Sequence, residues 1–271
     1  MKMRNLGIIG FGNMGAGIAE KLKNDYQLFV FDKDKTKTSA LSGINAAASI
    51  GGLLDNSEII ILAVKPQDME NILGEIKAKA KDKLVISIAA GISTGFIEKI
   101  LGAARVIRAM PNLAAKIGEG MTCLAKGRFV GSDDLDLAKN LFGRLGETLV
   151  IDEKMINAAT AISGSGPGYL YDFIGKKKIS DKAILGFEKQ LIKAGQTLSF
   201  NQREAYILAH TTVKGSLALL KFTGLTALEL KKQVASKGGT TEAGLEVLDK
   251  GGSLEEAAKA ALKRANELSK G

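Results

Sequence analysis

Short apolar runs alternate with amphipathic segments along residues 4–152. Each run is rich in aliphatic or β-branched residues and is closed by Gly, Pro or a charge, which is typical of parallel β-α-β units. The pattern predicts strands at 6–9, 27–31, 59–64, 84–89, 105–109, 121–126 and 148–151. It predicts helices between them at 14–24, 36–41, 66–80, 94–101 and 133–145. We therefore expect a doubly wound α/β sheet in this part of the chain.

The pattern changes at residue 153, where the strand-like runs stop. Long segments rich in Ala, Leu and Lys predict helices at 154–174, 180–197, 201–222, 226–235, 241–249 and 253–269. Several of them carry apolar residues on more than one face, so they need partners on both sides. We expect an all-helical second domain over residues 153–271, after a first domain over residues 1–152, and a homodimer in which the helical domains interlock.

The composition excludes several kinds of metal and disulfide site and indicates where in the cell the protein lies. The chain has 271 residues, 45% of them hydrophobic, with one Cys and one His. Because Cys123 and His210 are single, an internal disulfide, a Cys-rich zinc site and a His-pair zinc motif are excluded, and we expect no metal. Such cysteine usage favours a reducing, cytoplasmic location. No apolar run approaches the ~18 residues that a spanning helix needs, so we expect no membrane partner.

The formal net charge of +9 favours anionic ligands. The densest basic run, Lys176–Lys178, has no interleaved aromatic residues. That composition indicates a solvated face rather than a nucleic-acid platform. We therefore expect a small anionic ligand and no nucleic acid.

A glycine-rich segment, Gly10–Gly15, follows the first predicted strand and opens the first predicted helix. Its glycines suit a tight turn, close approach of the backbone to a pyrophosphate and helix–strand packing, while the helix N-terminus attracts phosphates. Asp32 ends the second predicted strand about 20 residues later, where a carboxylate would hold a ribose hydroxyl. This context predicts a Rossmann-type dinucleotide site, with a ligand-free turn as the alternative.

The residues after the second strand leave the cofactor open between NADPH and NADH. Asp32 favours NADH because a carboxylate repels a 2′-phosphate. Lys33, Lys35 and Lys37 could instead pair with that phosphate.

Two further segments, Ala63–Gln67 and Arg108–Asn112, lie at carboxyl ends of predicted strands. Ligands of open α/β sheets bind at that edge, although each segment could also be a plain turn. Lys65 could contact the nicotinamide ribose or simply follow the strand. The candidate cofactor contacts are Gly10, Gly12, Asn13, Met14, Gly15, Asp32, Lys33, Ala63, Val64, Lys65, Pro66, Met110 and Asn112.

The second region contains its own glycine-rich motif, Ser236–Leu245. Two glycines permit close backbone approach, Thr240 is placed to cap a helix, and the amides from Thr241 onward would point at an anion such as a carboxylate. A glycine-rich helix end joined to a Thr cap is the alternative. The segment Ser163–Tyr169 raises the same question. The candidate substrate contacts are Gly238, Gly239, Thr240 and Thr241.

Together these motifs resemble the pyrroline-5-carboxylate reductase family. The shared motifs are Gly-x-Gly-x-Met-Gly at 10–15, Ala-Val-Lys-Pro-Gln at 63–67, Arg-Ala-Met-Pro-Asn at 108–112, Ser-Gly-Ser-Gly-Pro at 163–167 and Gly-Gly-Thr-Thr at 238–241. The resemblance implies reduction of 1-pyrroline-5-carboxylate to L-proline, the last step of proline biosynthesis, by hydride transfer from NADPH or NADH to the C=N carbon. It also implies dimers that sometimes assemble into rings.

The resemblance further implies that the Gly-Gly-Thr-Thr segment binds the substrate carboxylate through backbone amides, with Thr241 near the imine as the candidate catalytic residue. The chain departs from the family pattern at Leu113-Ala114, Leu225–Ala227 and Lys237, and it is longer around Gly175–Leu185. Two alternatives therefore stay open. One is a related reductase of another cyclic imine or a β-hydroxyacid, and the other is a dinucleotide-binding sensor without catalysis.

Overall fold

The computed structural model describes residues 3–39, 41–176 and 180–269. One sheet runs in the order β3-β2-β1-β4-β5-β6-β7-β8, and the pairs from β3 to β6 are parallel. The seven predicted strands are confirmed to within a few residues, and the two-residue strand β3 was not predicted. The strands are β1 (Arg4–Ile9), β2 (Tyr26–Phe31), β3 (Asn45–Ala46), β4 (Ile59–Leu62), β5 (Leu84–Ser87), β6 (Arg105–Pro111), β7 (Gly120–Lys126) and β8 (Gly146–Val150).

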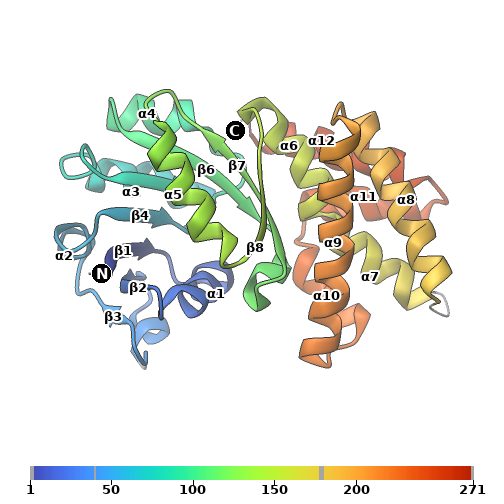
Figure 1. Ribbon diagram of the computed structural model, residues 1–271, viewed down its shortest axis with the longest axis horizontal. Helices are drawn as coiled ribbons and strands as arrows, with labels where there is room; N and C mark the ends of the chain where they lie inside the picture. Colours follow the sequence, from blue (N-terminus) through green and yellow to red (C-terminus); the bar gives the residue numbers. More distant parts are fainter. Residues whose placement is uncertain (1–2, 40, 177–179, 270–271) are drawn as a thin grey trace. The chain divides into compact units, whose positions relative to one another are not determined.

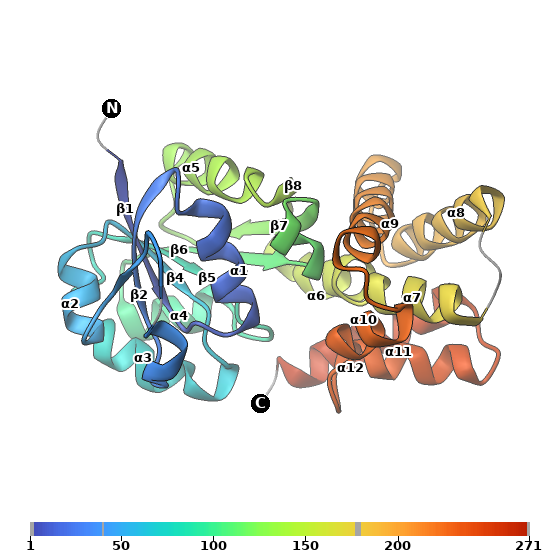
Figure 2. The ribbon, with the colours of Figure 1, turned by 90° about the horizontal axis from the view of Figure 1, so that it is seen from below.

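Helices cover both faces of the parallel part of this sheet (Figures 1 and 2). The helices α2 (Ile50–Asp55), α3 (Met69–Ile76) and α4 (Thr94–Leu101) bury one apolar cluster with β1, β4, β5 and β6. The helices α1 (Asn13–Leu22) and α5 (Ser132–Gly143) lie on the other side. Burial on both faces explains why β4 and β5 are short, wholly buried strands of mostly aliphatic residues. Strand order reverses between β1 and β4, and the carboxyl ends at such a switch point form a ligand crevice.

Three predicted helical features differ in the structure. The segment predicted as a helix at 36–41 forms only the 3₁₀ turn η1 (Lys35–Thr38), which the Asp34 carboxylate caps by accepting the Thr36 N–H at 3.1 Å. Ala40 lies outside the described residues. The predicted helix at 66–80 divides into a 3₁₀ turn η2 (Pro66–Asp68) and α3. Helix α2 was missed, since its two central glycines weaken the helical pattern while the Ser49 side chain caps its start.

The second region is helical, as predicted. Three of its starts are capping boxes, Asn201 with Glu204, Thr226 with Glu229 and Ser253 with Glu256. The predicted helix 154–174 is interrupted by a π-helical turn, and Lys177 and Lys178 of the basic run lie outside the described residues. The elements are η4 (Glu153–Met155), α6 (Ile156–Ala159), the π turn η5 (Thr160–Gly164), α7 (Gly166–Lys176), α8 (Asp181–Thr197), α9 (Gln202–Thr223), α10 (Ala227–Val234), α11 (Thr240–Asp249) and α12 (Leu254–Leu268).

Helix α7 lies at the centre of this helical region. Seven consecutive residues from Gly166 to Asp172 are buried, because α9, α10 and α11 pack around the helix. Within the described residues, no helix has the length and apolar character needed to cross a membrane.

The chain packs as two compact units that do not follow the boundary expected at residue 152. One unit comprises Met1–Met110 and Leu124–Leu145, and the other comprises Pro111–Cys123 and Gly146–Gly271. The segment before Cys123 belongs with the helices because Glu119 pairs with Lys214 of α9 at 3.0 Å. The change in sequence pattern marks where strands end, whereas packing divides the chain elsewhere.

Candidate active site

The loop between β1 and α1 is held against the ends of two strands. The Gly10 N–H donates to the Phe31 carbonyl at 2.8 Å, and the Ala63 N–H donates to the Ile9 carbonyl at 2.8 Å. Gly10 has φ +98°, and a Cβ there would stand 2.5 Å from the Ala63 oxygen. Only glycine fits this position without displacing the loop.

Gly12 presents open space at the start of α1. It is the N-cap residue, no side chain caps the helix, and no heavy atom lies within 4 Å of the place that a Cβ would take. The first turn contains no acidic residue. Its first amide groups have no side-chain cap, so this helix N-terminus can attract an anion.

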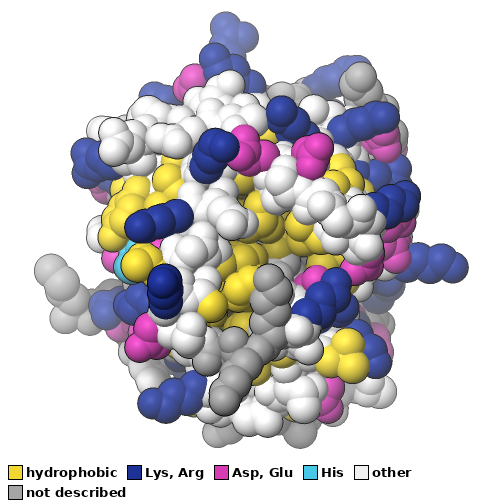
Figure 3. All heavy atoms as spheres, turned by 90° about the vertical axis from the view of Figure 1, so that its right-hand side faces the viewer, with side chains coloured by type: hydrophobic (Ala, Val, Ile, Leu, Met, Phe, Trp, Pro, Cys, Tyr) yellow, Lys and Arg dark blue, Asp and Glu magenta, His cyan; other side chains and the backbone are white. Residues whose placement is uncertain are grey.

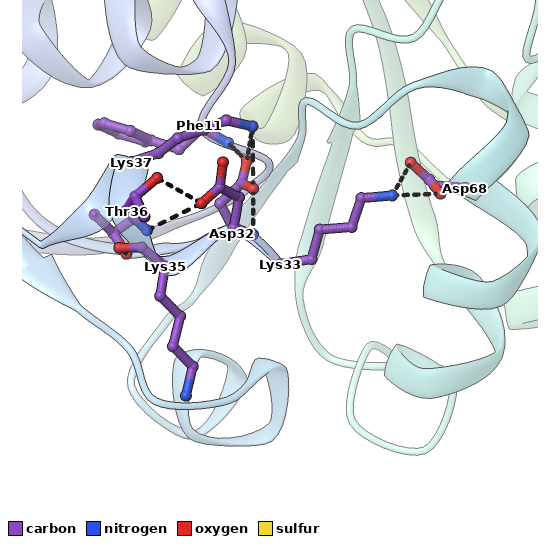
Figure 4. Close-up of polar contacts among 9 residues, drawn as sticks. Phe11, Asp32, Lys33, Lys35, Thr36, Lys37 and Asp68 are labelled. Carbon is purple, nitrogen blue, oxygen red and sulfur yellow. Dashed lines mark hydrogen bonds and ion pairs between the residues drawn. The ribbon is translucent and has the colours of Figure 1, made fainter.

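Asp32 joins this loop to the end of β2 (Figure 4). Its Oδ2 accepts the Phe11 N–H at 2.7 Å and its Oδ1 accepts the Asp34 N–H at 2.9 Å. The Lys37 Nζ lies 3.3 and 3.4 Å from the two oxygens. Burial alone would raise the pKa of the Asp32 carboxyl, but these hydrogen bonds and the Lys37 charge outweigh burial and lower it. Asp32 is thus a charged, 8% exposed carboxylate that already has three partners.

The neighbouring lysines extend in different directions. Lys33 reaches Asp68, with Nζ 3.1 Å from both carboxylate oxygens. Lys37 faces Asp32, whereas Figure 4 shows Lys35 extending away from it. Lys37 is therefore the lysine that shares the predicted ribose position.

A pocket of about 280 Å³ lies at this edge of the sheet. It brings together seven of the thirteen predicted cofactor residues. It adds six residues that were not predicted to contact the cofactor, and the sequence signalled only Lys37 among them, through its charge. The six are Ile9, Phe31, Lys37, Asp68, Asn71 and Ile72. The pocket is lined by Ile9, Gly10, Gly12, Phe31, Asp32, Lys33, Lys37, Ala63, Val64, Lys65, Asp68, Asn71 and Ile72.

The remaining predicted cofactor residues do not line this pocket. Asn13, Met14 and Gly15 form the first turn of α1, and Pro66 opens η2. Met110 lies in β6. The Asn112 side chain is buried and accepts the Met121 N–H at 3.1 Å, so it braces the backbone near β7.

The second glycine motif begins helix α11, with one correction to the expected cap. Gly239, not Thr240, is the N-cap, since its backbone is extended and its carbonyl accepts the Ala243 N–H at 3.2 Å. The Thr240 hydroxyl is instead 3.0 Å from the Ser165 Oγ. Thr240 is therefore the first helical residue and is tied to the segment before α7.

The hydroxyl groups of Thr240 and Thr241 on α11 both contact the Ser165 hydroxyl. Thr241 is 4% exposed, and its Oγ1 donates to the Ser165 Oγ at 3.2 Å. Tyr169, four residues after Ser165, is fully buried on α7. Burial raises the pKa of its hydroxyl, so this group stays protonated at neutral pH. The Ser163–Tyr169 segment thus belongs to the same structural cluster as Thr240 and Thr241.

The loop before α11 already uses the backbone N–H groups of two of the four residues expected to contact the substrate. The Gly238 N–H donates to the Glu242 carboxylate at 2.6 Å, and the Gly239 N–H donates to the Ser236 carbonyl at 3.0 Å. The first helical amides, those of Thr240, Thr241 and Glu242, point out of the helix start. These three groups are consequently the better candidates for holding an anion.

The structure also shows where candidate metal ligands and the single histidine lie. Among the described residues, no group of three His, Cys, Asp or Glu is placed to hold a metal ion. His210 is 44% exposed on α9, where its Nδ1 lies 3.0 Å from the Glu188 Oε1.

Comparison with known proteins identifies both regions. Residues 153–270 match the family model described as pyrroline-5-carboxylate reductase dimerisation, and residues 5–91 match the model described as NADP oxidoreductase coenzyme F420-dependent. The chain is 36% identical to the pyrroline-5-carboxylate reductase of Synechocystis sp., over 98% of both chains. It is 35% identical to the enzyme of Escherichia coli, over 98% of this chain and 99% of that one.

Solved structures agree with this result. Plasmodium falciparum pyrroline carboxylate reductase with NADP bound has a TM-score of 0.66 at 29% identity, covering 99% of this chain and 100% of that chain. The Coxiella burnetii pyrroline-5-carboxylate reductase has a TM-score of 0.67 at 31% identity over all of both chains. Full-length similarity at this level, together with the glycine loop and the Gly-Gly-Thr-Thr helix start, shows that the chain belongs to the pyrroline-5-carboxylate reductase family.

Proposed function

We propose that this protein reduces 1-pyrroline-5-carboxylate to L-proline with NADPH or NADH. The observation that carries the proposal is the open helix start at Gly12 in a chain whose relatives over their full length are pyrroline-5-carboxylate reductases. The reaction consumes the imine, a hydride equivalent and one proton, and yields the secondary amine and the oxidised nucleotide. When bound, the nucleotide supplies the hydride.

The first unit holds the nucleotide in this proposal. The first amides of α1 bind the pyrophosphate, because Gly12 before them carries no side chain and leaves open space. Gly10 shapes the turn, since its own N–H donates to the Phe31 carbonyl. Val64 and Lys65 line the same pocket and contact the dinucleotide beyond the pyrophosphate. This unit, Met1–Met110 with Leu124–Leu145, accordingly serves as the dinucleotide-binding part of the chain.

The second unit holds the substrate. The amides at the start of α11 bind the carboxylate, and the Thr241 hydroxyl hydrogen-bonds the ring nitrogen. The Thr241–Ser165 hydrogen bond supports this role, since it fixes the buried Thr241 side chain. A protonated C=N is already electrophilic, so the protein mainly has to bind, orient and exclude water. Residues 153–271 thus combine substrate binding with dimerisation.

Lys37 makes the nucleotide site permissive toward a 2′-phosphate. The Asp32 charge is satisfied by two backbone amides and offset by the Lys37 ammonium group, which itself lines the pocket. We therefore assign Asp32 mainly to holding the loop and Lys37 to the phosphate of NADPH.

The proposed assembly is a cytoplasmic homodimer that forms through the helical region. Rings of such dimers are the proposed higher state. The dimerisation family model supports the dimer. Figure 3 shows apolar atoms gathered near the centre of the face that the helical region presents, with Lys and Arg side chains around them. Leu185 and Tyr206 are about half exposed on α8 and α9.

The test is oxidation of NADPH and NADH by the purified protein with 1-pyrroline-5-carboxylate, followed by loss of absorbance. We expect turnover, and proline as the product by amino-acid analysis. Nucleotide binding without turnover would contradict the proposal. Activity with another cyclic imine or with a β-hydroxyacid would then indicate a related reductase, and none with any would indicate a sensor.

A further inference from the structure

Gly238 is held from both sides by charged side chains of two helices. Glu242, in the first turn of α11, accepts the Gly238 N–H at 2.6 Å. Arg264, on α12, donates from its Nε to the Gly238 carbonyl at 2.8 Å. Both polar groups of this one residue are therefore occupied, and each contact fixes one of the two peptide planes that flank it.

The conformation of Gly238 makes these contacts consequential. Gly238 has φ +69°, and Gly239 after it is the N-cap of α11. Because left-handed backbone at a glycine is readily lost to other conformations, the loop has little stiffness of its own. The direction of the chain entering α11 thus depends on what holds Gly238 in place.

Arg264 is itself oriented by a third side chain. Its Nη1 lies 3.0 Å from the Glu267 Oε2, one turn further along α12. A Cβ at position 238 would stand 3.6 Å from Nη2, so the guanidinium group lies directly beside the loop.

We propose that Arg264 and Glu242 are positioning residues that hold the Ser236–Gly239 loop so that the amides of Thr240 and Thr241 face the substrate carboxylate. Neither side chain needs to touch the substrate, since both act through Gly238. The proposal rests on the proposed function of this helix start. It assigns a role in substrate binding to α12, which carries none of the shared motifs.

The two side chains act differently in this arrangement. Glu242 is needed as a hydrogen-bond acceptor and not for its charge, so Glu242→Gln retains the contact through its amide oxygen. Arg264 is needed for its Nε donor, which lysine lacks, so Arg264→Lys does not replace it. This difference separates positioning from a general charge effect.

The experiment measures steady-state kinetics for 1-pyrroline-5-carboxylate with Arg264→Met, Glu242→Ala and Glu242→Gln. We expect KM for the substrate to rise about tenfold or more in the first two variants, since small displacements of a binding group cost up to ~100-fold. The KM for the nucleotide and kcat should stay within about threefold of the wild type, because the loop acts on carboxylate binding. Glu242→Gln should restore most of the substrate affinity.

Matched controls separate this role from surface charge. Glu246→Ala removes an exposed carboxylate one turn further along α11, and Lys263→Met removes an exposed ammonium group from the residue before Arg264 on α12. Both should leave the substrate KM within about twofold. Binding of L-proline to each variant, measured by calorimetry in the presence of oxidised nucleotide, gives a readout that does not depend on turnover.

Two failures can be told apart. Absence of turnover by the wild-type protein contradicts the proposed function. Wild-type turnover together with an unchanged substrate KM in Arg264→Met and Glu242→Ala overturns the positioning role alone, as does a fall in kcat without a change in KM. Should Arg264→Met fold poorly, the comparison of Glu242→Ala with Glu242→Gln still decides the matter, since α12 is then unaltered.

Discussion

Gly10 and Gly12 stand two positions apart in one loop, yet side chains there have opposite consequences. A Cβ at Gly12 enters open space and needs no unusual backbone angle, whereas one at Gly10 meets the Ala63 carbonyl at φ +98°. Gly12→Val should therefore fold normally and lose at least about tenfold in nucleotide affinity, which is 1.4 kcal/mol. Fluorescence titration with NADPH measures this. Normal affinity in Gly12→Val would contradict the glycine-loop assignment.

Gly10→Ala is the matched comparison. It should lower the free energy of unfolding by more than about 1 kcal/mol, because alanine tolerates positive φ poorly. Thermal unfolding of the two variants distinguishes a blocked site from a damaged loop.

Lys37 and Lys35 provide a matched pair for cofactor choice. Both follow Asp32, but only Lys37 contacts its carboxylate and lines the pocket. Lys37→Met should raise KM for NADPH about tenfold or more, because a charge-assisted hydrogen bond contributes about 1.5–3 kcal/mol, and it should change KM for NADH less. Lys35→Met should change neither the KM for NADPH nor the KM for NADH. An NADPH/NADH ratio that is unchanged in Lys37→Met would remove this lysine from the phosphate site.

Thr241→Val tests the hydroxyl while keeping the shape of the side chain. Thr241 is buried, so losing the Oγ1 contact with Ser165 and with the ring nitrogen should lower kcat about tenfold or more. Nucleotide affinity should be unchanged. Thr241→Ser retains the hydroxyl and should keep most of the activity; equal turnover in the wild type and in Thr241→Val would exclude a catalytic role.

At the scale of elements, Asp32 fastens the β1–α1 loop to the end of β2. The fold lowers the pKa of this carboxyl. Its contribution to stability is therefore fully present above the unfolded value of about 3.9 and is lost as the pH falls through the lower folded value. Asp32→Asn should reduce the free energy of unfolding by about 1–3 kcal/mol at neutral pH.

Urea unfolding at neutral pH and at about pH 3 checks this dependence, because the difference between wild type and variant should shrink in acid. A difference that is the same at both pH values would mean that the charge of Asp32 does not stabilise the loop.

The sequence predicted most elements because their signals are local. The strands are aliphatic runs, and capping boxes such as Thr226 with Glu229 indicate where helices begin. Thr226 lies within Leu225–Ala227, one of the segments where the chain departs from the family pattern. The cap of α11 was misplaced because capping propensity favours Thr240, whereas the Ser165 hydroxyl attracts its side chain. No local signal announces contacts such as those of Asn71 in the pocket or Arg264 at Gly238, since they join residues far apart in the chain.

At the scale of the whole molecule, the assembly can be tested on exposed apolar side chains. Leu185→Asp combined with Tyr206→Asp should weaken the dimer by about 2 kcal/mol or more, because both side chains are exposed and apolar in the region matched to dimerisation. Light scattering during gel filtration measures the mass against concentration. Phe96→Asp, on α4 of the other unit, is the control and should remain dimeric. A double variant with the wild-type dimer affinity would place the interface on another face.

The π-helical turn at Thr160–Gly164 affects how the length of this sequence can change in evolution. The Ser165 N–H reaches back five residues to the Thr160 carbonyl at 2.8 Å, so this stretch holds one residue more than an α-helix would use. Because the turn absorbs this extra residue, α7 after it keeps the direction that its packing against α9, α10 and α11 requires. Removing one residue of the turn would leave a regular helix, whereas removing one from α7 itself would rotate everything after it by about 100°. The length of the chain can therefore change by one residue at this turn while α7 keeps its packing, which is not true within α7.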